Sequence, residues 1–384
     1  MPAGVLGRLR ARLLDGPGAG ANAFRLAAGL SLALQVGLLL SRDGLWGGGD
    51  LPPHLRLAEL TREDPGLHNP YAPAYHVLGA LLEPLVGFER FTAGFALASA
   101  ALLIAGFRAF QKAAALPDES AALFALTPYL MSLSWCTPKV EAAGYALLLF
   151  GLACLLRERR AAAALALGAC FAVHTASALL FGIAGGALCL ARRDARGLAA
   201  LAAGSALALP LVASHLAAGC SLAEALLFAP GGYARGLREG VLPPNWPWLA
   251  PLAGPVALVA AALGAPALWR RQRAVGILCA VLAGLYLTNL WLAPFGLRSL
   301  VTLLRGLSVL AIPVAAAAGV FAARSPTARA WVLGASAAFA LAAGPLVVPR
   351  ACFVRPIAEG EIRGIQVERC TFQWRQPGRL LGPR

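Results

Sequence analysis

Long apolar runs separated by short polar segments recur along almost the whole chain. A helix that crosses a membrane needs about 20 predominantly apolar residues. Counting such runs predicts an all-α integral membrane protein with about eleven transmembrane helices, called spans below. The expected spans are residues 24–40, 91–110, 121–135, 143–157, 161–174, 177–190, 198–215, 251–269, 274–293, 302–322 and 331–347.

The first two spans are separated by a long first loop, residues 41–90, which contains one weaker apolar stretch. The stretch from Tyr75 to Phe88 is short, and it contains Glu83 and Pro84. Counting it as a span would move every later loop to the opposite side of the membrane. We therefore expect a helix that lies on the membrane surface or dips into it.

Arginines are concentrated in every second connection between the expected spans. Such clusters face the cytoplasm, so we expect a multi-pass protein of a bacterial-type inner (plasma) membrane with a cytoplasmic N-terminus. The first loop, the loop 216–250 and the polar tail 348–384 are then extracytoplasmic. The clusters include Arg157, Arg159, Arg160, Arg192, Arg193, Arg196, Arg270, Arg271 and Arg273.

Composition agrees with a membrane protein and argues against nucleic-acid binding and nucleotide binding. The chain has 384 residues, of which 59% are hydrophobic and 13% charged, and its net charge is +15. A soluble protein carries about 25% charged residues. Most arginines flank apolar runs, where they orient the chain, so we expect no nucleic-acid partner. The sequence also contains no Walker loop and no dinucleotide-binding glycine motif.

The stretch "GGGDLPPHLRLAEL" places an acid and an imidazole, Asp50 and His54, close together just after the first span. A carboxylate near the apolar membrane loses hydration, so its pKa rises and it can act as a general base. The alternative is that Asp50 caps the helix that begins at the following prolines. Asp50 and His54 could also share a helical face, with His54 as a ligand of a divalent metal ion.

The first loop continues as "EDPGLHNPYAPAYHVLGALLEPLVG", in which a Pro-Tyr-x-Pro-x-Tyr-His sequence leads into the surface helix. Together with the acid after the first span, this pattern resembles the GT-C-type glycosyltransferases. That superfamily includes protein mannosyltransferases, lipid A aminoarabinose transferases and the catalytic subunits of oligosaccharyltransferase. The resemblance implies a multi-span enzyme that uses a polyprenyl-phosphate-linked sugar at the outer membrane face. It also implies that Asp50 is catalytic.

Two further features fit the resemblance. In "TPYLMSLSWCTPKVEAAGYALLL", Glu141 takes the place of a second catalytic acid after the third span, with Lys139 beside it. In "GLRSLVTLLRGLSVLAIPVA", Arg298 and Arg305 lie where members of the superfamily place an arginine that meets the lipid phosphate. The alternatives are an ion pair between Glu141 and Lys139 and arginines that extend to the membrane surface.

All five histidines are expected at or near the extracytoplasmic face. His54, His76 and His174 are candidates for substrate binding, as are Lys139 and the two arginines. His174 interrupts the sequence between the fifth and sixth spans. The alternative for this residue is a hydrogen bond to the backbone at the turn.

We expect three parts in the chain: an N-terminal GT-C-like catalytic module, residues 1–175; the remaining transmembrane helices, residues 176–347; and the polar tail, residues 348–384.

The expected activity is transfer of a sugar from a polyprenyl-phosphate carrier to an acceptor at the extracytoplasmic face. Membrane lipid is an expected partner, and a divalent metal ion is a possible cofactor. The alternatives are a transporter or flippase of a lipid-linked substrate and a non-catalytic lipid-binding protein of the same fold. The lack of an internal repeat favours the enzyme over the transporter.

The tail contains Cys352 and Cys370, which the span count places in an oxidising compartment. Strand-like pieces in "EIRGIQVERCTFQW", around Gly364, predict a hairpin that brings the two thiols together as a disulfide. A bridge that closes a loop of this size stabilises a fold by about 3 kcal/mol. The alternative is two free thiols on a cytoplasmic tail.

Overall fold

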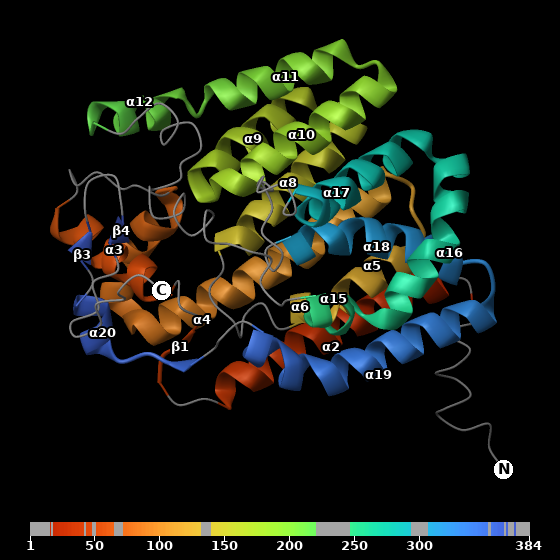
Figure 1. Ribbon diagram of the computed structural model, residues 1–384, viewed down its shortest axis with the longest axis horizontal. Coiled ribbons are helices and arrows are strands. Elements are labelled where there is room, and N and C mark those ends of the chain that lie inside the picture. The colour runs from red at the N-terminus through yellow and green to blue at the C-terminus, as the bar shows by residue number, and fades with distance from the viewer. Residues whose placement is uncertain are drawn as a thin grey trace.

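Helices make up almost all of the structure, a computed structural model that describes residues 16, 18–41, 44–47, 51–64, 72–131, 140–219, 246–292, 306–351, 355–364, 366–367 and 372–373. The helices are α2 (Ala19–Leu40), α3 (Leu51–Glu63), α4 (Ala74–Ala113), α5 (Asp118–Ala125), α6 (Pro128–Met131), α8 (Val140–Leu156), α9 (Arg160–Val173), α10 (Thr175–Arg192), α11 (Ala195–Ala206), α12 (Leu209–Ala217), α15 (Trp246–Ala253), α16 (Pro255–Arg271), α17 (Arg273–Leu292), α18 (Gly306–Ala322), α19 (Pro326–Ala351) and α20 (Glu359–Arg363). The strands are β1 (Trp46–Gly47), β2 (Arg355–Pro356), β3 (Gln366–Val367) and β4 (Phe372–Gln373). Most of the long helices run side by side along the longest axis of the molecule (Figure 1).

Apolar helices support the expectation of a membrane protein with an all-α fold. Four helical segments are long and apolar enough to cross a membrane: α2, α4, α10 and the segment Ala195–Ala217, which combines α11 and α12. Shorter apolar helices occupy Val140–Leu156, Arg160–Val173, Arg273–Leu287 and Val309–Ala322. Every expected span contains helical residues, whereas the total of eleven crossings stays a prediction.

Three expected spans are interrupted by breaks in the helix, which the sequence analysis did not anticipate. In the span 121–135, α5 ends before Thr127 and α6 begins at Pro128, because a proline disfavours helical backbone at the preceding residue. A second break separates α15 from α16 at Gly254, whose φ is 86°. A third separates α11 from α12 just before Pro210. These spans are therefore pairs of helices rather than single straight ones.

Helix α4 combines the expected surface helix with the second span in one element of 40 residues. A straight helix of that length would measure about 60 Å, twice the hydrocarbon thickness of about 30 Å. At Gly87 the backbone leaves the helical conformation, with φ 81° and ψ 159°, so α4 is kinked there. Before the kink, one face exposes large apolar side chains to the surroundings, as a surface helix in contact with lipid requires. These side chains are Val77, Leu78, Leu81, Leu82, Leu85 and Val86.

The turns that carry the arginine clusters meet at one end of the bundle. We call it the arginine end, and it comprises residues 114–117, 157–159, 193–194, 272 and 323–325. The Arg157 side chain reaches the end of α4, where it donates to the Ala109 carbonyl at 3.4 Å. The Gln272 amide donates to the Ala115 carbonyl at 2.9 Å. An ion pair between Glu119 and Arg329 joins α5 to α19. The clusters therefore lie together, as the charge pattern predicted.

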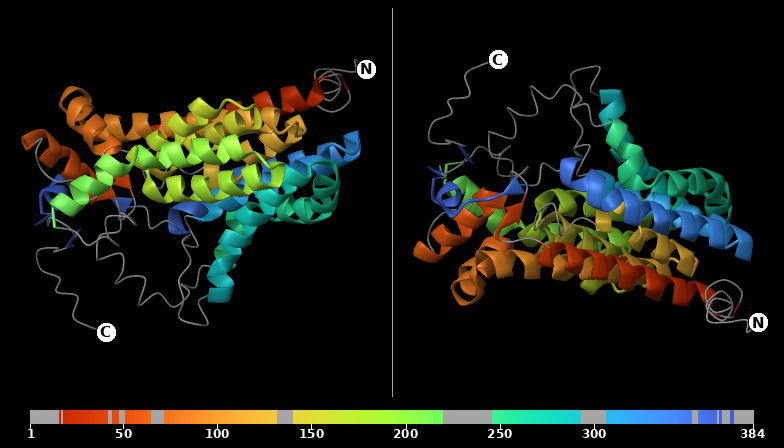
Figure 2. Two further views of the ribbon diagram at one scale, coloured as in Figure 1. Left: turned by 90° about the horizontal axis from the view of Figure 1, so that it is seen from above. Right: turned by 90° about the horizontal axis from the view of Figure 1, so that it is seen from below.

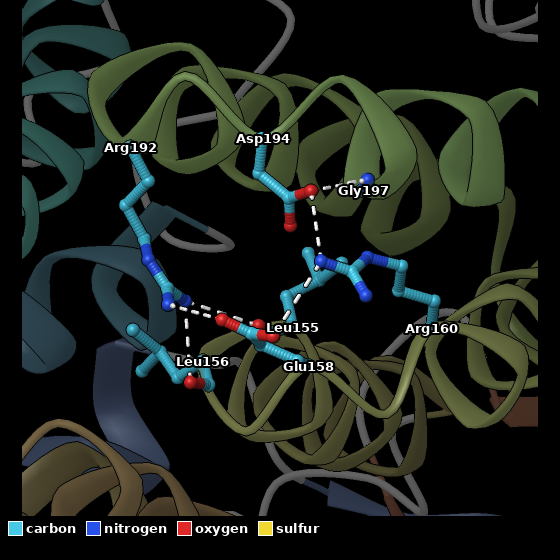
Figure 3. A network of polar contacts seen from close by, with 7 residues as sticks. All are labelled: Leu155, Leu156, Glu158, Arg160, Arg192, Asp194 and Gly197. Carbon is cyan, nitrogen blue, oxygen red and sulfur yellow. Dashed lines mark hydrogen bonds and ion pairs between the residues drawn. The ribbon is translucent and has the colours of Figure 1, made fainter.

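A network of polar contacts joins two turns of the arginine end, residues 157–159 and 193–194 (Figure 3). Arg160 Nη2 lies 3.2 Å from Asp194 Oδ1, and Arg192 Nη2 lies 3.5 Å from Glu158 Oε1. The Asp194 carboxylate also caps α11 by accepting a hydrogen bond from the Gly197 N–H at 2.9 Å. This hydrogen bond, together with the Arg160 guanidinium, holds the pKa of Asp194 below its usual range. Arg160 and Arg192 therefore connect the turn after α8 to the turn after α10.

The C-terminal tail lies beside the first loop at the other end of the bundle, which we call the outer end: α3, residues 74–86, the turn at His174, and residues 355–364. Strand β1 pairs with β2 in an antiparallel register, and α20 packs on α3. Figure 2 shows these elements at the end away from the start of α2. The first loop and the tail therefore share one side of the bundle, which agrees with the expected even number of spans between them.

The expected hairpin in the tail is confirmed in part. Within "EIRGIQVERCTFQW", β3 pairs with β4 in an antiparallel hairpin. The first residues of that stretch, Glu361–Arg363, are helical within α20 instead, and Gly364 is the C-cap of that helix. Cys352 and Cys370 lie outside the described residues, so their disulfide stays a prediction.

The two ends of the bundle should react differently with an impermeant maleimide applied to intact cells. Arg193 and Ala358 are both exposed, at the arginine end and the outer end respectively. We expect labelling of the Ala358→Cys variant above the background of the unsubstituted chain, and no such increase for Arg193→Cys. Labelling of Arg193→Cys alone would reverse the orientation, and equal labelling of both variants would contradict a division into two sides.

Candidate functional site at the outer end

An aromatic cluster forms the floor of the outer end. Tyr75 is 1% exposed, and its ring lies 4.7 Å from that of Phe95 and 5.3 Å from that of Phe91, measured between centroids. Val140 of α8 and Val173 of α9 pack against the same group. The cluster therefore brings the starts of α4 and α8 together with the end of α9.

Two of the histidines singled out by the sequence meet directly above this cluster. The Nδ1 atom of His54 lies 2.9 Å from the Nε2 atom of His76, so one ring donates a hydrogen bond to the other. The rings are nearly parallel, with an interplanar angle of 16°. His76 is 1% exposed, while His54 is partly exposed. Protonation of both rings would place two positive charges in contact, so the pair is suited to hold one shared proton.

The position of His54 depends on the packing of α3 against α4. A Cβ atom at Gly79 would lie 2.7 Å from the Cβ atom of Ala58, so glycine permits this close approach. An ion pair between Arg62 and Glu83 joins the same two helices further along. Glu83, which weakened the expectation of a span at this stretch, therefore holds the surface helix to α3.

Glu141 lies in the first turn of α8 and is 6% exposed. A buried carboxylate is costly unless other groups compensate it, which makes such a residue a candidate for function. Tyr145 lies one turn further along the same helix, and its ring lies 6.5 Å from that of His174. Glu141 therefore lies at the start of the helix whose next turn contacts His174 through Tyr145.

His174 forms the junction between α9 and α10. Its Nδ1 atom accepts a hydrogen bond from the Ser177 N–H at 3.2 Å and lies 2.7 Å from the Ser177 hydroxyl oxygen. A Cβ atom at Gly144 would lie 2.8 Å from that oxygen, so α8 and α10 approach closely here. The structure therefore contains the backbone hydrogen bond considered as the alternative for His174, and substrate binding by this residue stays a prediction.

Several candidate residues fall outside the described part of the chain, namely Asp50, Lys139, Arg298 and Arg305. Asp50 directly precedes α3, and Lys139 directly precedes α8. Within the described ranges, no group of three or more histidine, cysteine, aspartate or glutamate side chains could hold a metal ion. The proposed metal-ligand role of His54 therefore depends on residues outside these ranges.

The sequence analysis missed the contact between His54 and His76 and the participation of the tail. A signal for the first was present, because Tyr75 and His76 follow Pro73 at the start of a helix and so occupy fixed positions. For the second, the isoleucines at 357 and 362 were isolated apolar residues in a polar segment, which indicates burial but not a partner.

Comparison of the chain with protein-family models, with curated proteins and with solved structures finds no match.

Proposed function

We propose that the chain is a membrane glycosyltransferase that moves a sugar from a polyprenyl-phosphate carrier to an acceptor at the extracytoplasmic face. The observation that supports this proposal most is the grouping of the His54–His76 pair and the buried Glu141 at the end opposite the arginine turns. Polar groups able to bind or move protons lie there beside apolar helices. An amphiphilic donor, with a polar head and an apolar chain, needs both.

The proposed reaction breaks one bond and forms another. The acceptor hydroxyl attacks the anomeric carbon of the sugar, and the bond from that carbon to the carrier phosphate breaks. Asp50 takes the hydroxyl proton as the new bond forms. Polyprenyl phosphate leaves with the bonding electrons, and Arg298 or Arg305 compensates the charge that develops on it. Glu141 and His54 orient the acceptor or a divalent ion.

The other proposed contacts follow from position along the chain. Lys139 directly precedes the helix of Glu141, so it is placed to bind the donor phosphate or to pair with that acid. His76 acts through His54, because its own ring is buried. His174 borders the same cluster through Tyr145.

The affinity for the carrier tests the proposed role of the two late arginines. Purified protein in lipid nanodiscs would be titrated with undecaprenyl phosphate, and bound lipid measured by native mass spectrometry. Loss of a phosphate-binding guanidinium should weaken binding about tenfold or more in Arg298→Gln or Arg305→Gln, with partial recovery in the lysine variants.

Arg193→Gln provides the matched control, because Arg193 is an exposed arginine at the arginine end. Its affinity should equal that of the wild type. Equal affinity in the wild type and both late-arginine variants would remove these residues from the site. Tight binding without any transfer to an acceptor would favour the flippase or the non-catalytic lipid-binding protein instead.

A further inference from the structure

The tail segment 355–364 is attached to the first loop through its backbone. In the antiparallel pair of β1 with β2, Trp46 is opposite Pro356 and Gly47 is opposite Arg355. The Ile357 N–H then donates to the Leu45 carbonyl at 2.9 Å. A Cβ atom at position 47 would lie 2.4 Å from a methyl carbon of Leu51 and 3.2 Å from one of Ile357. The two segments are therefore in close contact around Gly47.

Apolar side chains extend this attachment onto α3. Leu51, Leu55, Ile357 and Ile362 form a small cluster separate from the main core, and their exposures are 1%, 0%, 7% and 1%. Phe88, just after the kink in α4, packs against the same cluster. In contrast, Ala358 and Arg363, the neighbours of the two isoleucines, are exposed. The segment therefore directs its two isoleucines toward α3, while Ala358 and Arg363 face outward.

Helix α3 lies between two supports. Ala58 faces Gly79 of α4, while Leu51 and Leu55 face the tail. An isolated helix of 13 residues is marginal in water, so α3 depends on packing for its stability. His54 is adjacent to Leu55 in the sequence, and Asp50 directly precedes Leu51. Whatever holds these leucines in place also sets the position of His54.

We propose that residues 355–364 are a positioning element of the outer site, in which Ile357 and Ile362 hold α3 against α4 and so fix His54 beside His76. The attachment of the tail does not depend on the proposed sugar transfer. The role of the outer site in catalysis does rest on that proposed function. The tail is then part of the functional unit, although it lies about 300 residues from the first loop along the chain.

Hydrogen–deuterium exchange of the full-length chain in nanodiscs tests the proposal. The Ile357→Ala/Ile362→Ala double variant removes the apolar contact and keeps the backbone able to pair. Peptides from α3 should exchange about a hundredfold faster than in the wild type, because each buried isoleucine that is truncated removes a large packing contribution. Peptides from α10, whose buried side chains belong to the main core rather than to the tail cluster, should exchange at the wild-type rate and report that the bundle is folded.

Arg363→Gln is the matched control, because it changes an exposed position directly after Ile362. Its α3 exchange should equal that of the wild type. Unchanged α3 exchange in the double isoleucine variant, with α10 also unchanged, would overturn the proposal.

A second measurement does not require a destabilised variant. Cysteines introduced together at Trp46 and Pro356 lie opposite each other in the β pair and should form a disulfide on mild oxidation, identified by peptide mass spectrometry. Failure of this bridge to form would overturn the attachment, whatever the outcome of transfer assays. A bridge and a tail-dependent α3 in a chain without transfer activity would keep the positioning role and remove only the proposed function.

Discussion

Replacing Asp50 by asparagine should abolish sugar transfer while leaving the chain folded. Loss of a general base slows a reaction by about a hundredfold to ten-thousandfold. Asparagine has nearly the shape of aspartate but cannot take the proton from the acceptor hydroxyl. Membranes containing the variant would be supplied with lipid-linked sugars extracted from the host cell. The release of polyprenyl phosphate would then be followed by mass spectrometry.

The same variant distinguishes a catalytic role of Asp50 from a role in helix capping. Asparagine caps a helix about as well as aspartate, so a capping role for Asp50 predicts near-normal transfer and stability. Asp64→Asn is the matched control, because Asp64 is an exposed aspartate just after the other end of α3. It should transfer at the wild-type rate. A normal rate in Asp50→Asn as well would remove Asp50 from the proposed mechanism and favour the cap.

The sequence predicted the helices well because apolar runs are local signals. It could not predict the breaks at Thr127, Gly254 and Leu207, where single prolines and glycines compete with the hydrophobic pattern over a few residues. It predicted a helix over residues 75–88, and Gly87 supplies the kink that separates this helix from residues 91–110. That kink depends on a positive φ, which glycine tolerates and most other residues do not.

The candidate site was only partly predictable, since its contacts join distant parts of the chain. His54 and His76 were both singled out, but nothing local shows that the two rings touch. The charge pattern grouped the arginine turns correctly at one end of the bundle, because such clusters recur in every second connection between the expected spans. The attachment of the tail to β1 and α3 depends on two isoleucines, too few to form a recognisable pattern.

Replacing Gly264 by alanine should destabilise the bundle substantially, because this glycine allows α16 and α18 to touch through their backbones. A Cβ atom at position 264 would lie 1.9 Å from the carbonyl oxygen of Ala317 and 3.3 Å from the Cβ atom of Phe321. Backbone atoms cannot rotate away as a flexible side chain can, so the helices must separate. Small residues allow such close approach between helices in membranes. Overpacking of this kind costs about 1–3 kcal/mol.

Gly334→Ala gives the opposite expectation and serves as the control. Gly334 is an exposed residue within α19, and no described atom lies within 4 Å of the Cβ it would gain. Alanine is favoured over glycine in a helix interior by about 1 kcal/mol, so this variant should unfold at the same or a higher temperature. Thermal unfolding in nanodiscs, followed by tryptophan fluorescence, would compare the two variants. A decrease of the unfolding temperature in Gly264→Ala but not in Gly334→Ala is the expected result. Equal unfolding temperatures would mean that α16 and α18 do not approach as closely as the structure has them.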